Sequence, residues 1–250
     1  MGFSFDLTGR TAIVTGASSG LGARFGQLLA QSGANVALAA RRKDRLDTLA
    51  GELGARATAI QMDVAREADV IAGYDAAEAA FGTVDTIVAN AGIDGAGMAT
   101  DMPEDEIERT LNVNLKGALL TAREGAKRLM AAGQTNGRIV MIASITAFQP
   151  SPGLAAYSAS KAGVVQLGRT LAREWARRGM CVNTISPGYI RTDINADWFD
   201  TDMGKKQVKR FPKQRLMGQE GLDAMLLFLC SDAAEFVTGT DFVLDDGQTL

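Results

Sequence analysis

Short apolar runs alternate with longer amphipathic stretches along almost the whole chain. The runs are rich in β-branched residues, as in buried strands, whereas the stretches between them repeat apolar residues with the period of a helix. The expected strands cover residues 11–16, 35–40, 56–62, 84–90, 137–144, 180–188 and 240–247. The clearest helical stretches cover residues 20–32, 67–82, 104–131 and 155–179. This alternation predicts one α/β domain over residues 1–250, a doubly wound sheet of about seven parallel strands with helices on both faces.

Composition excludes several classes of partner. The 250 residues carry a net charge of −3, so nothing attracts nucleic acid or an anionic membrane surface. The longest apolar run, residues 224–230, falls far short of the roughly 20 residues that cross a bilayer. The N-terminus lacks the basic and apolar parts of a secretory signal, and we therefore expect a cytoplasmic protein. With no histidine and two widely separated cysteines, no metal site is expected.

The first expected strand runs directly into the glycine-rich segment TGASSGLG at residues 15–22. Its glycines allow a tight turn, and the helix that follows offers free backbone N–H groups to a pyrophosphate. This arrangement favours a dinucleotide site, the alternative being a purely structural turn. The expected cofactor contacts in this segment are Gly16, Ser18, Ser19, Gly20, Leu21 and Gly22.

The end of the second expected strand bears on which dinucleotide binds. Sites that choose NAD place an acidic residue there, on the ribose diol. This chain has Arg41 and Arg42 instead, and arginine can grip a 2′-phosphate through paired hydrogen bonds. The pair favours NADP(H), with NAD(H) as a second cofactor; alternatively, both arginines only solvate the start of a helix.

Tyr157 and Lys161 lie four residues apart in an expected helix, so they share one face. A lysine cation about 5 Å from a phenol could lower the phenol pKa by about two units. In a chain without histidine, this pair is a candidate acid–base device. Two unrelated surface residues would have the same spacing, so the stretch alone leaves both interpretations open.

Six motifs in order make the sequence resemble the short-chain dehydrogenase/reductase family over essentially its whole length. They are TGASSGLG at 15–22, ANAG at 89–92, Asn112-Val113-Asn114, Ser144, Tyr157 with Lys161, and PGYIRT at 187–192. The resemblance implies a Rossmann-like fold, an oxidoreductase of C–OH and C=O groups, and a homotetramer. Two positions depart from the family pattern. Ala89 replaces a common asparagine, and Ser19 replaces the basic residue of some NADP-preferring members, which leaves the phosphate grip mainly to Arg41, assisted by Arg42 and Ser18.

The resemblance also implies a role for each catalytic residue. Tyr157 would give a proton to the substrate carbonyl oxygen as hydride arrives from the nicotinamide, or remove it in the oxidative direction. Ser144 would hydrogen-bond the same oxygen. Lys161 would hold the nicotinamide ribose and keep the pKa of Tyr157 low. Asn114 would hold a water that relays protons towards Lys161; the alternative is that it only caps backbone groups.

Further cofactor contacts follow from the same resemblance, after the third, fourth and sixth expected strands. For Asp63 the alternative is a helix cap. The full set is Asp63, Val64, Asn90, Ala91, Gly92, Pro187, Gly188, Ile190 and Thr192, together with Tyr157 and Lys161.

Residues 193–217 have no strand role, and family members use this segment as a mobile lid over the substrate. The alternative is a helix packed permanently on the body. The apolar side chains of the segment are Trp198, Phe199, Met203 and Phe211, and further lining is expected from Ile145, Gln149, Leu154 and Tyr189. None of these is basic, which favours a neutral, fairly bulky ketone or its secondary alcohol.

Three functions fit these residues. The first is an NADPH-dependent carbonyl reductase or secondary alcohol dehydrogenase with a Ser-Tyr-Lys-Asn tetrad. The second is a 3-oxoacyl thioester reductase, because the lid could meet an acidic acyl carrier protein through Lys205, Lys206, Lys209 and Arg210. The third is a dinucleotide-sensing protein without chemistry, which would not need Ser144, Tyr157 and Lys161 together.

Overall fold

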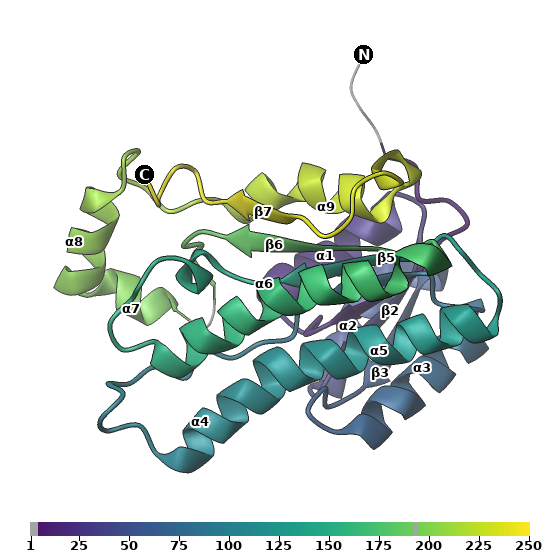
Figure 1. Ribbon diagram of the computed structural model, residues 1–250, viewed down its shortest axis with the longest axis horizontal. Coiled ribbons are helices and arrows are strands. Elements are labelled where there is room, and N and C mark those ends of the chain that lie inside the picture. Colours follow the sequence, from purple (N-terminus) through teal and green to yellow (C-terminus); the bar gives the residue numbers. More distant parts are fainter. Residues whose placement is uncertain (1–4, 193–194) are drawn as a thin grey trace.

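The computed structural model describes residues 5–192 and 195–250, and one sheet of seven parallel strands runs through its centre (Figure 1). The order across the sheet is β3-β2-β1-β4-β5-β6-β7, so the chain winds outward from β1 in both directions. The doubly wound parallel sheet is confirmed, and each expected range contains the observed strand. The strands are β1 Thr11–Thr15, β2 Asn35–Ala40, β3 Ala57–Gln61, β4 Thr86–Ala89, β5 Arg138–Ile142, β6 Cys181–Pro187 and β7 Asp241–Leu244.

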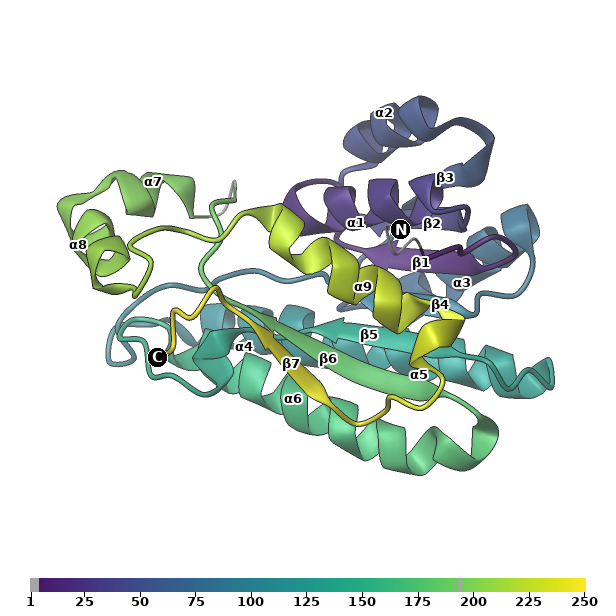
Figure 2. The ribbon, with the colours of Figure 1, turned by 90° about the horizontal axis from the view of Figure 1, so that it is seen from above.

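Helices cover both faces of the sheet, with α1, α2 and α9 on one face and α3, α5 and α6 on the other (Figure 2). In the described residues, no helix has both the length and the apolar character needed to cross a bilayer. The helices are α1 Gly20–Gln31, α2 Lys43–Leu53, α3 Glu67–Phe81, α4 Glu104–Leu111, α5 Gly117–Ala131, α6 Ala155–Trp175, α7 Ala196–Asp200, α8 Asp202–Arg210 and α9 Asp223–Cys230.

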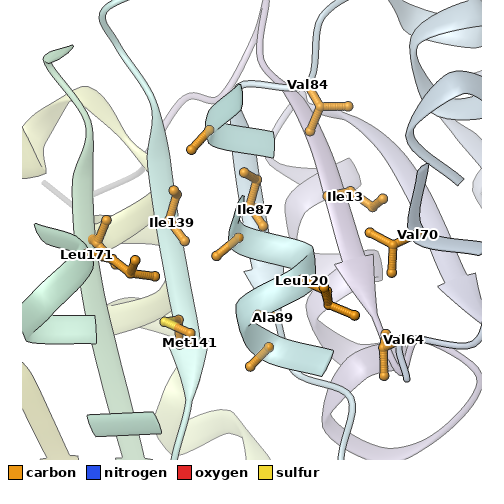
Figure 3. Close-up of a cluster of buried hydrophobic side chains, with 14 of the residues drawn as sticks. Ile13, Val64, Val70, Val84, Ile87, Ala89, Leu120, Ile139, Met141 and Leu171 are labelled. Atoms are coloured by element: carbon orange, nitrogen blue, oxygen red, sulfur yellow. The ribbon is translucent and has the colours of Figure 1, made fainter. Parts of the chain in front are cut away.

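Two apolar cores lie between the sheet and these helices, because successive side chains of a strand point to opposite faces. In β1, Ile13 belongs to one core and Val14 to the other. Ile13, Ile87 and Ile139 are register partners on neighbouring strands and are almost completely buried, with Leu120 of α5 above them (Figure 3). Each such side chain contributes roughly 1.5–3 kcal/mol of burial energy, so the sheet is a rigid base for the loops at its carboxyl edge.

The expected helical stretch 104–131 is interrupted. Between α4 and α5 the chain makes one π-helical turn, Asn112–Lys116, which holds more residues per turn than an α-helix. Such turns are frequent at functional sites. This one carries Asn114, which is buried in the protein.

The expected lid folds into the two short helices α7 and α8, which project beyond the carboxyl ends of β6 and β7 (Figures 1 and 2). Residues 193 and 194 of this segment lie outside the described residues. Phe199 and Phe211 are buried and lie 6.0 and 5.7 Å from the ring centre of Tyr189. Met203 is 74% exposed, so this methionine does not close the pocket in this structure.

Candidate active site

A cavity of about 890 Å³ opens at the carboxyl edge of the sheet, lined by the loops that follow β1 to β6. In doubly wound sheets, ligands bind at this edge where the strand order reverses, here between β1 and β4. All the residues that the sequence assigns to the cofactor line this one cavity. They are Gly16, Ser18, Ser19, Gly20, Leu21, Gly22, Arg41, Arg42, Asp63, Val64, Asn90, Ala91, Gly92, Tyr157, Lys161, Pro187, Gly188, Ile190 and Thr192.

The glycine-rich loop packs so closely on the end of β4 that side chains would not fit. A Cβ atom at Gly22 would lie 2.3 Å from the carbonyl oxygen of Gly16 and 2.7 Å from Asn90 Nδ2. Gly16 itself has a φ of +72°, which favours glycine. At the start of α1, Ser19 makes no capping hydrogen bond, so its side chain leaves the first N–H groups of the helix to a ligand. The loop therefore fits a dinucleotide pyrophosphate.

The two arginines after β2 differ in their surroundings. Arg42 donates from Nε and Nη2 to Ser18 Oγ at 3.1 and 2.9 Å, and from Nη2 to Ser19 Oγ at 2.7 Å. Within the described chain, the Arg41 side chain has no hydrogen-bond partner. Sequence analysis placed Arg41 first in the phosphate grip. In the structure both arginines line the cavity, and Arg42 is the one whose guanidinium reaches the serines of the glycine-rich loop.

Tyr157, Lys161 and Ser144 come together at the opposite part of the cavity. Lys161 Nζ lies 5.6 Å from the ring centre of Tyr157 and donates to the carbonyl oxygen of Ile142 at 2.8 Å. Ser144 begins a 3-10 turn directly after β5, and its hydroxyl accepts hydrogen bonds from N and Oγ1 of Thr146 at 3.2 and 3.1 Å. The end of β5 and the first turns of α6 thus hold one hydroxyl, one phenol and one ammonium group in a shared site.

The electrostatics of the pair differ from the expectation. The side chain of Tyr157 is half-buried by surface area, but protein atoms surround it closely. This burial raises the pKa of Tyr157 to about 12, although its hydrogen bond with Ser144 acts in the opposite direction. Burial lowers the pKa of Lys161 to about 8. The pKa of Tyr157 is thus raised in this structure, because loss of solvation outweighs the hydrogen bond with Ser144, and the effect of Lys161 on this pKa stays a prediction.

Asn114 does not line the cavity but lies directly behind it. Its Oδ1 accepts from the backbone N of Ile93 at 2.8 Å, and its Nδ2 donates to Ile93 O at 2.9 Å and Ser160 Oγ at 3.0 Å. Ser160 Oγ donates in turn to the carbonyl oxygen of Tyr157 at 2.6 Å. Asn114 thus makes the backbone hydrogen bonds of its alternative role and joins the loop after β4 to the first turns of α6, and its role toward a water stays a prediction.

Asp63 forms part of the cap that was the alternative to a cofactor contact. Its Oδ1 accepts the backbone N–H of Ala65 at 3.0 Å, as in a capping turn, while the residue still lines the cavity. Among residues 5–192 and 195–250, no three His, Cys, Asp or Glu side chains form a group that could hold a metal ion.

The substrate end of the cavity contains most of the expected lining and several residues that sequence analysis missed. Gln149 is a wrong assignment: it is exposed and outside the cavity, because the 3-10 turn after Ser144 carries the chain outward. The expected residues that do line it are Ile145, Leu154, Tyr189, Trp198 and Phe199, and the missed ones include Asp94, Thr146, Ser151, Asn195 and Gln207.

Gln248, near the C-terminus, supports the substrate wall from behind. Its Oε1 accepts the backbone N–H of Tyr189 at 2.6 Å, and its Nε2 donates to the carbonyl oxygen of the same residue at 3.2 Å. Tyr189 in turn shares a 3.2 Å hydrogen bond between its hydroxyl and that of Ser151. No sequence signal connects Gln248 with Tyr189, because the two residues meet only in the folded chain.

Comparisons with known proteins point to one family. A family model described as short chain dehydrogenase matches residues 10–203. The D-threitol dehydrogenase of Mycolicibacterium smegmatis is 37% identical over 251 residues, covering 99% of this chain and 96% of that protein. The 3beta-hydroxysteroid dehydrogenase 1 of Eggerthella lenta is 37% identical, with 98% and 95% covered. A solved gluconate 5-dehydrogenase from Burkholderia cenocepacia, in complex with NADP and tartrate, has a TM-score of 0.92 at 32% identity, covering 98% of this chain and 97% of that one.

Proposed function

Because the chain belongs to the short-chain dehydrogenase family, we propose that it is an NADP(H)-preferring secondary alcohol dehydrogenase and ketone reductase. The family itself makes it an oxidoreductase of CH–OH groups that uses a nicotinamide dinucleotide. The proposed substrate is neutral and fairly bulky. One observation carries the proposal: a single cavity has the Ser144, Tyr157 and Lys161 side chains in one part and the cluster of Arg42 with Ser18 in another.

The proposed chemistry assigns the proton to the protein. When bound, the nicotinamide supplies or accepts hydride. Tyr157 carries its proton at neutral pH because its pKa is about 12, so it can donate to the substrate oxygen during ketone reduction. Ser144 stabilises the negative charge that develops on that oxygen. Lys161 has a pKa of about 8 and can supply a proton after each turnover, with Asn114 holding the loop beside it.

Preference for NADP(H) is the finer part of the proposal, and Arg42 supports it. The guanidinium is held by Ser18 and Ser19 before any ligand arrives, so little side-chain entropy is lost when a 2′-phosphate binds. No acidic residue stands at the end of β2 to favour the free ribose diol of NAD(H).

The decisive experiment is Tyr157→Phe with NADPH and a panel of ketones. The ring keeps its packing while the phenolic proton beside Ser144 and Lys161 is lost, so we expect turnover to fall by about 100- to 10,000-fold. NADPH affinity should stay within threefold of wild type. Turnover within threefold of wild type would refute the assignment.

Reduction of 3-oxoacyl thioesters is the second candidate, and one observation favours it. Gln207 of α8 lines the cavity, and the neighbouring basic side chains of this helix are exposed to solvent, where an acidic carrier could meet them. The double variant Lys205→Ala, Lys206→Ala tests it. If the thioester is the substrate, this variant should raise KM for the carrier-bound thioester and leave small ketones unaffected.

We also infer a homotetramer. Strand β7 is an edge of the sheet, paired only with β6 in the described chain. Large apolar side chains near this edge face solvent, with exposed fractions of 93% for Phe236, 44% for Val243 and 97% for Leu250. An apolar edge strand is a surface that proteins commonly cover, here by a second copy of the chain.

A further inference from the structure

Asp94 is the acidic side chain at the substrate part of the cavity. It follows β4 and lines the same space as Ser144 and Tyr157. Its Oδ1 accepts the backbone N–H of Gly95 at 2.9 Å, and in the described part of the chain no lysine or arginine pairs with it. One carboxylate oxygen is therefore left without a protein partner, at a wall where the substrate must lie.

In the described residues, none of the lysine and arginine side chains that line the cavity pairs with Asp94. Among the described lining residues they are Arg41 and Arg42, which follow β2, and Lys161, which donates to the carbonyl oxygen of Ile142. The charge of Asp94 also acts on the catalytic group, since it contributes, after burial, to the raised pKa of Tyr157. A substrate carboxylate or phosphate beside Asp94 would thus meet repulsion without a compensating cation.

Hydroxyl groups complete this wall. The Ser151 and Tyr189 hydroxyls share one hydrogen bond of 3.2 Å, and the Tyr189 ring is fixed between Phe199 and Phe211. One of the two hydroxyl protons stays free for a ligand, and both oxygens keep acceptor capacity. Asp94 can only accept hydrogen bonds, whereas the Ser151 and Tyr189 hydroxyls can donate and accept them. Together these groups match a ligand with several hydroxyl groups.

We propose that Asp94 determines specificity for a neutral, polyhydroxylated alcohol or ketone. Substrate hydroxyls donate to the free oxygen of Asp94 and exchange hydrogen bonds with the Ser151–Tyr189 pair, while analogues with an anionic group at that position are rejected. This inference rests on the proposed chemistry and on a neutral substrate, but it makes hydroxyl groups, and not bulk, the feature of the substrate that the pocket recognises. The reacting C–OH carbon of the substrate lies at Ser144 and Tyr157. Asp94 recognises hydroxyl groups on other carbon atoms of the same substrate.

Three ketones test the proposal with NADPH. They are a four-carbon trihydroxyketone, its analogue in which one terminal hydroxymethyl group is a carboxylate, and butanone. We expect wild type to have its highest kcat/KM with the trihydroxyketone. Asp94→Asn keeps the shape of the side chain and removes its charge. It should raise kcat/KM for the carboxylated analogue by about 3- to 10-fold and lower it for the trihydroxyketone by about 3- to 10-fold.

Asp101→Asn is the matched control, because it removes the same charge from the same loop at an exposed position outside the cavity. It should leave all three ketones unchanged. Equal kcat/KM of wild type for the trihydroxyketone and its carboxylated analogue would overturn the inference. It would also be overturned if Asp94→Asn and Asp101→Asn changed the ratio of these two kcat/KM values by the same factor. No wild-type turnover of the trihydroxyketone would also overturn it. Tyr157→Phe, assayed in parallel, reports on the proposed function separately, since retained turnover there refutes the chemistry whatever the substrate ratio.

Discussion

Replacing Arg42 by alanine removes the guanidinium that lies across the serines of the glycine-rich loop. In wild type this group makes three hydrogen bonds, two to Ser18 Oγ and one to Ser19 Oγ. These bonds hold the cation beside the glycine-rich loop, where the proposed function has it meet an adenosine 2′-phosphate. Arg41 lines the same cavity but has no such bonds in the described chain. The two single variants therefore compare an oriented cation with an unoriented one.

The expected magnitude follows from the kind of contact. A hydrogen bond to a charged group is worth about 1.5–3 kcal/mol, and because Arg42 is exposed, solvent screening places it in the lower half of that range. Arg42→Ala should weaken NADPH binding by about 10- to 50-fold. NADH lacks the 2′-phosphate, so its affinity should change by less than about threefold. Arg41→Ala acts only through a screened charge, and we expect a loss of about fivefold or less for NADPH.

Fluorescence titration of NADPH and NADH at low and high ionic strength measures these affinities directly. Lys43→Ala is the control, because Lys43 pairs with Asp47 on the solvent side of α2 and does not line the cavity. Equal losses for both cofactors in Arg42→Ala would show that Arg42 only supports the loop. A larger NADPH loss in Arg41→Ala than in Arg42→Ala would refute the argument from preorganisation.

Three further outcomes are expected. Burial moves the folded-state pKa of Lys161 from 10.5 to about 8, so its charge lowers the free energy of unfolding below about pH 8, and this loss disappears as the pH rises towards 10.5. Lys161→Met should therefore raise the free energy of unfolding at neutral pH by up to about 3 kcal/mol while abolishing turnover. Urea titrations at neutral pH and near pH 10 measure this, and a variant no more stable than wild type at neutral pH would contradict it. Gln248→Ala removes both hydrogen bonds to the backbone of Tyr189, so it should raise KM for ketones by about 5- to 10-fold and leave kcat and NADPH affinity nearly unchanged. An effect confined to kcat would exclude this role. Light scattering at micromolar concentration should give a tetramer that Val243→Asp dissociates, and a monomeric wild type would refute the assembly.

The sheet and the cofactor loop were predictable because local sequence determines them. Strands buried on both faces must be short apolar runs, as in β1 and β5, whatever surrounds them. Glycine at position 22 is likewise required by a contact made within the same loop, where a Cβ would meet Gly16 O. Tyr157 and Lys161, the proposed catalytic pair, could be placed side by side because both belong to one helix.

Features that depend on distant partners were not predictable. Arg41 and Arg42 are equivalent in sequence, and only the folded positions of Ser18 and Ser19 distinguish them. Gln149 was assigned to the pocket because it follows Ser144, but distance along the chain does not give the direction of a turn. The same limit hides Asp94 and Gln248, which meet Tyr157 and Tyr189, respectively, from distant parts of the sequence.

The π-helical turn Asn112–Lys116 also sets the rotational phase of α5 relative to α4. An α-helix turns by about 100° per residue. If the same residues wound as a regular α-helix, the one extra residue of the π turn would rotate everything after it by about that angle. Leu120 and Leu129, now buried against the sheet, would turn towards solvent. The wider turn thus keeps Leu120 against the sheet and Asn114 against Ile93 and Ser160 at the same time, and deleting one of its residues would keep the phase of α5 at the expense of these Asn114 contacts.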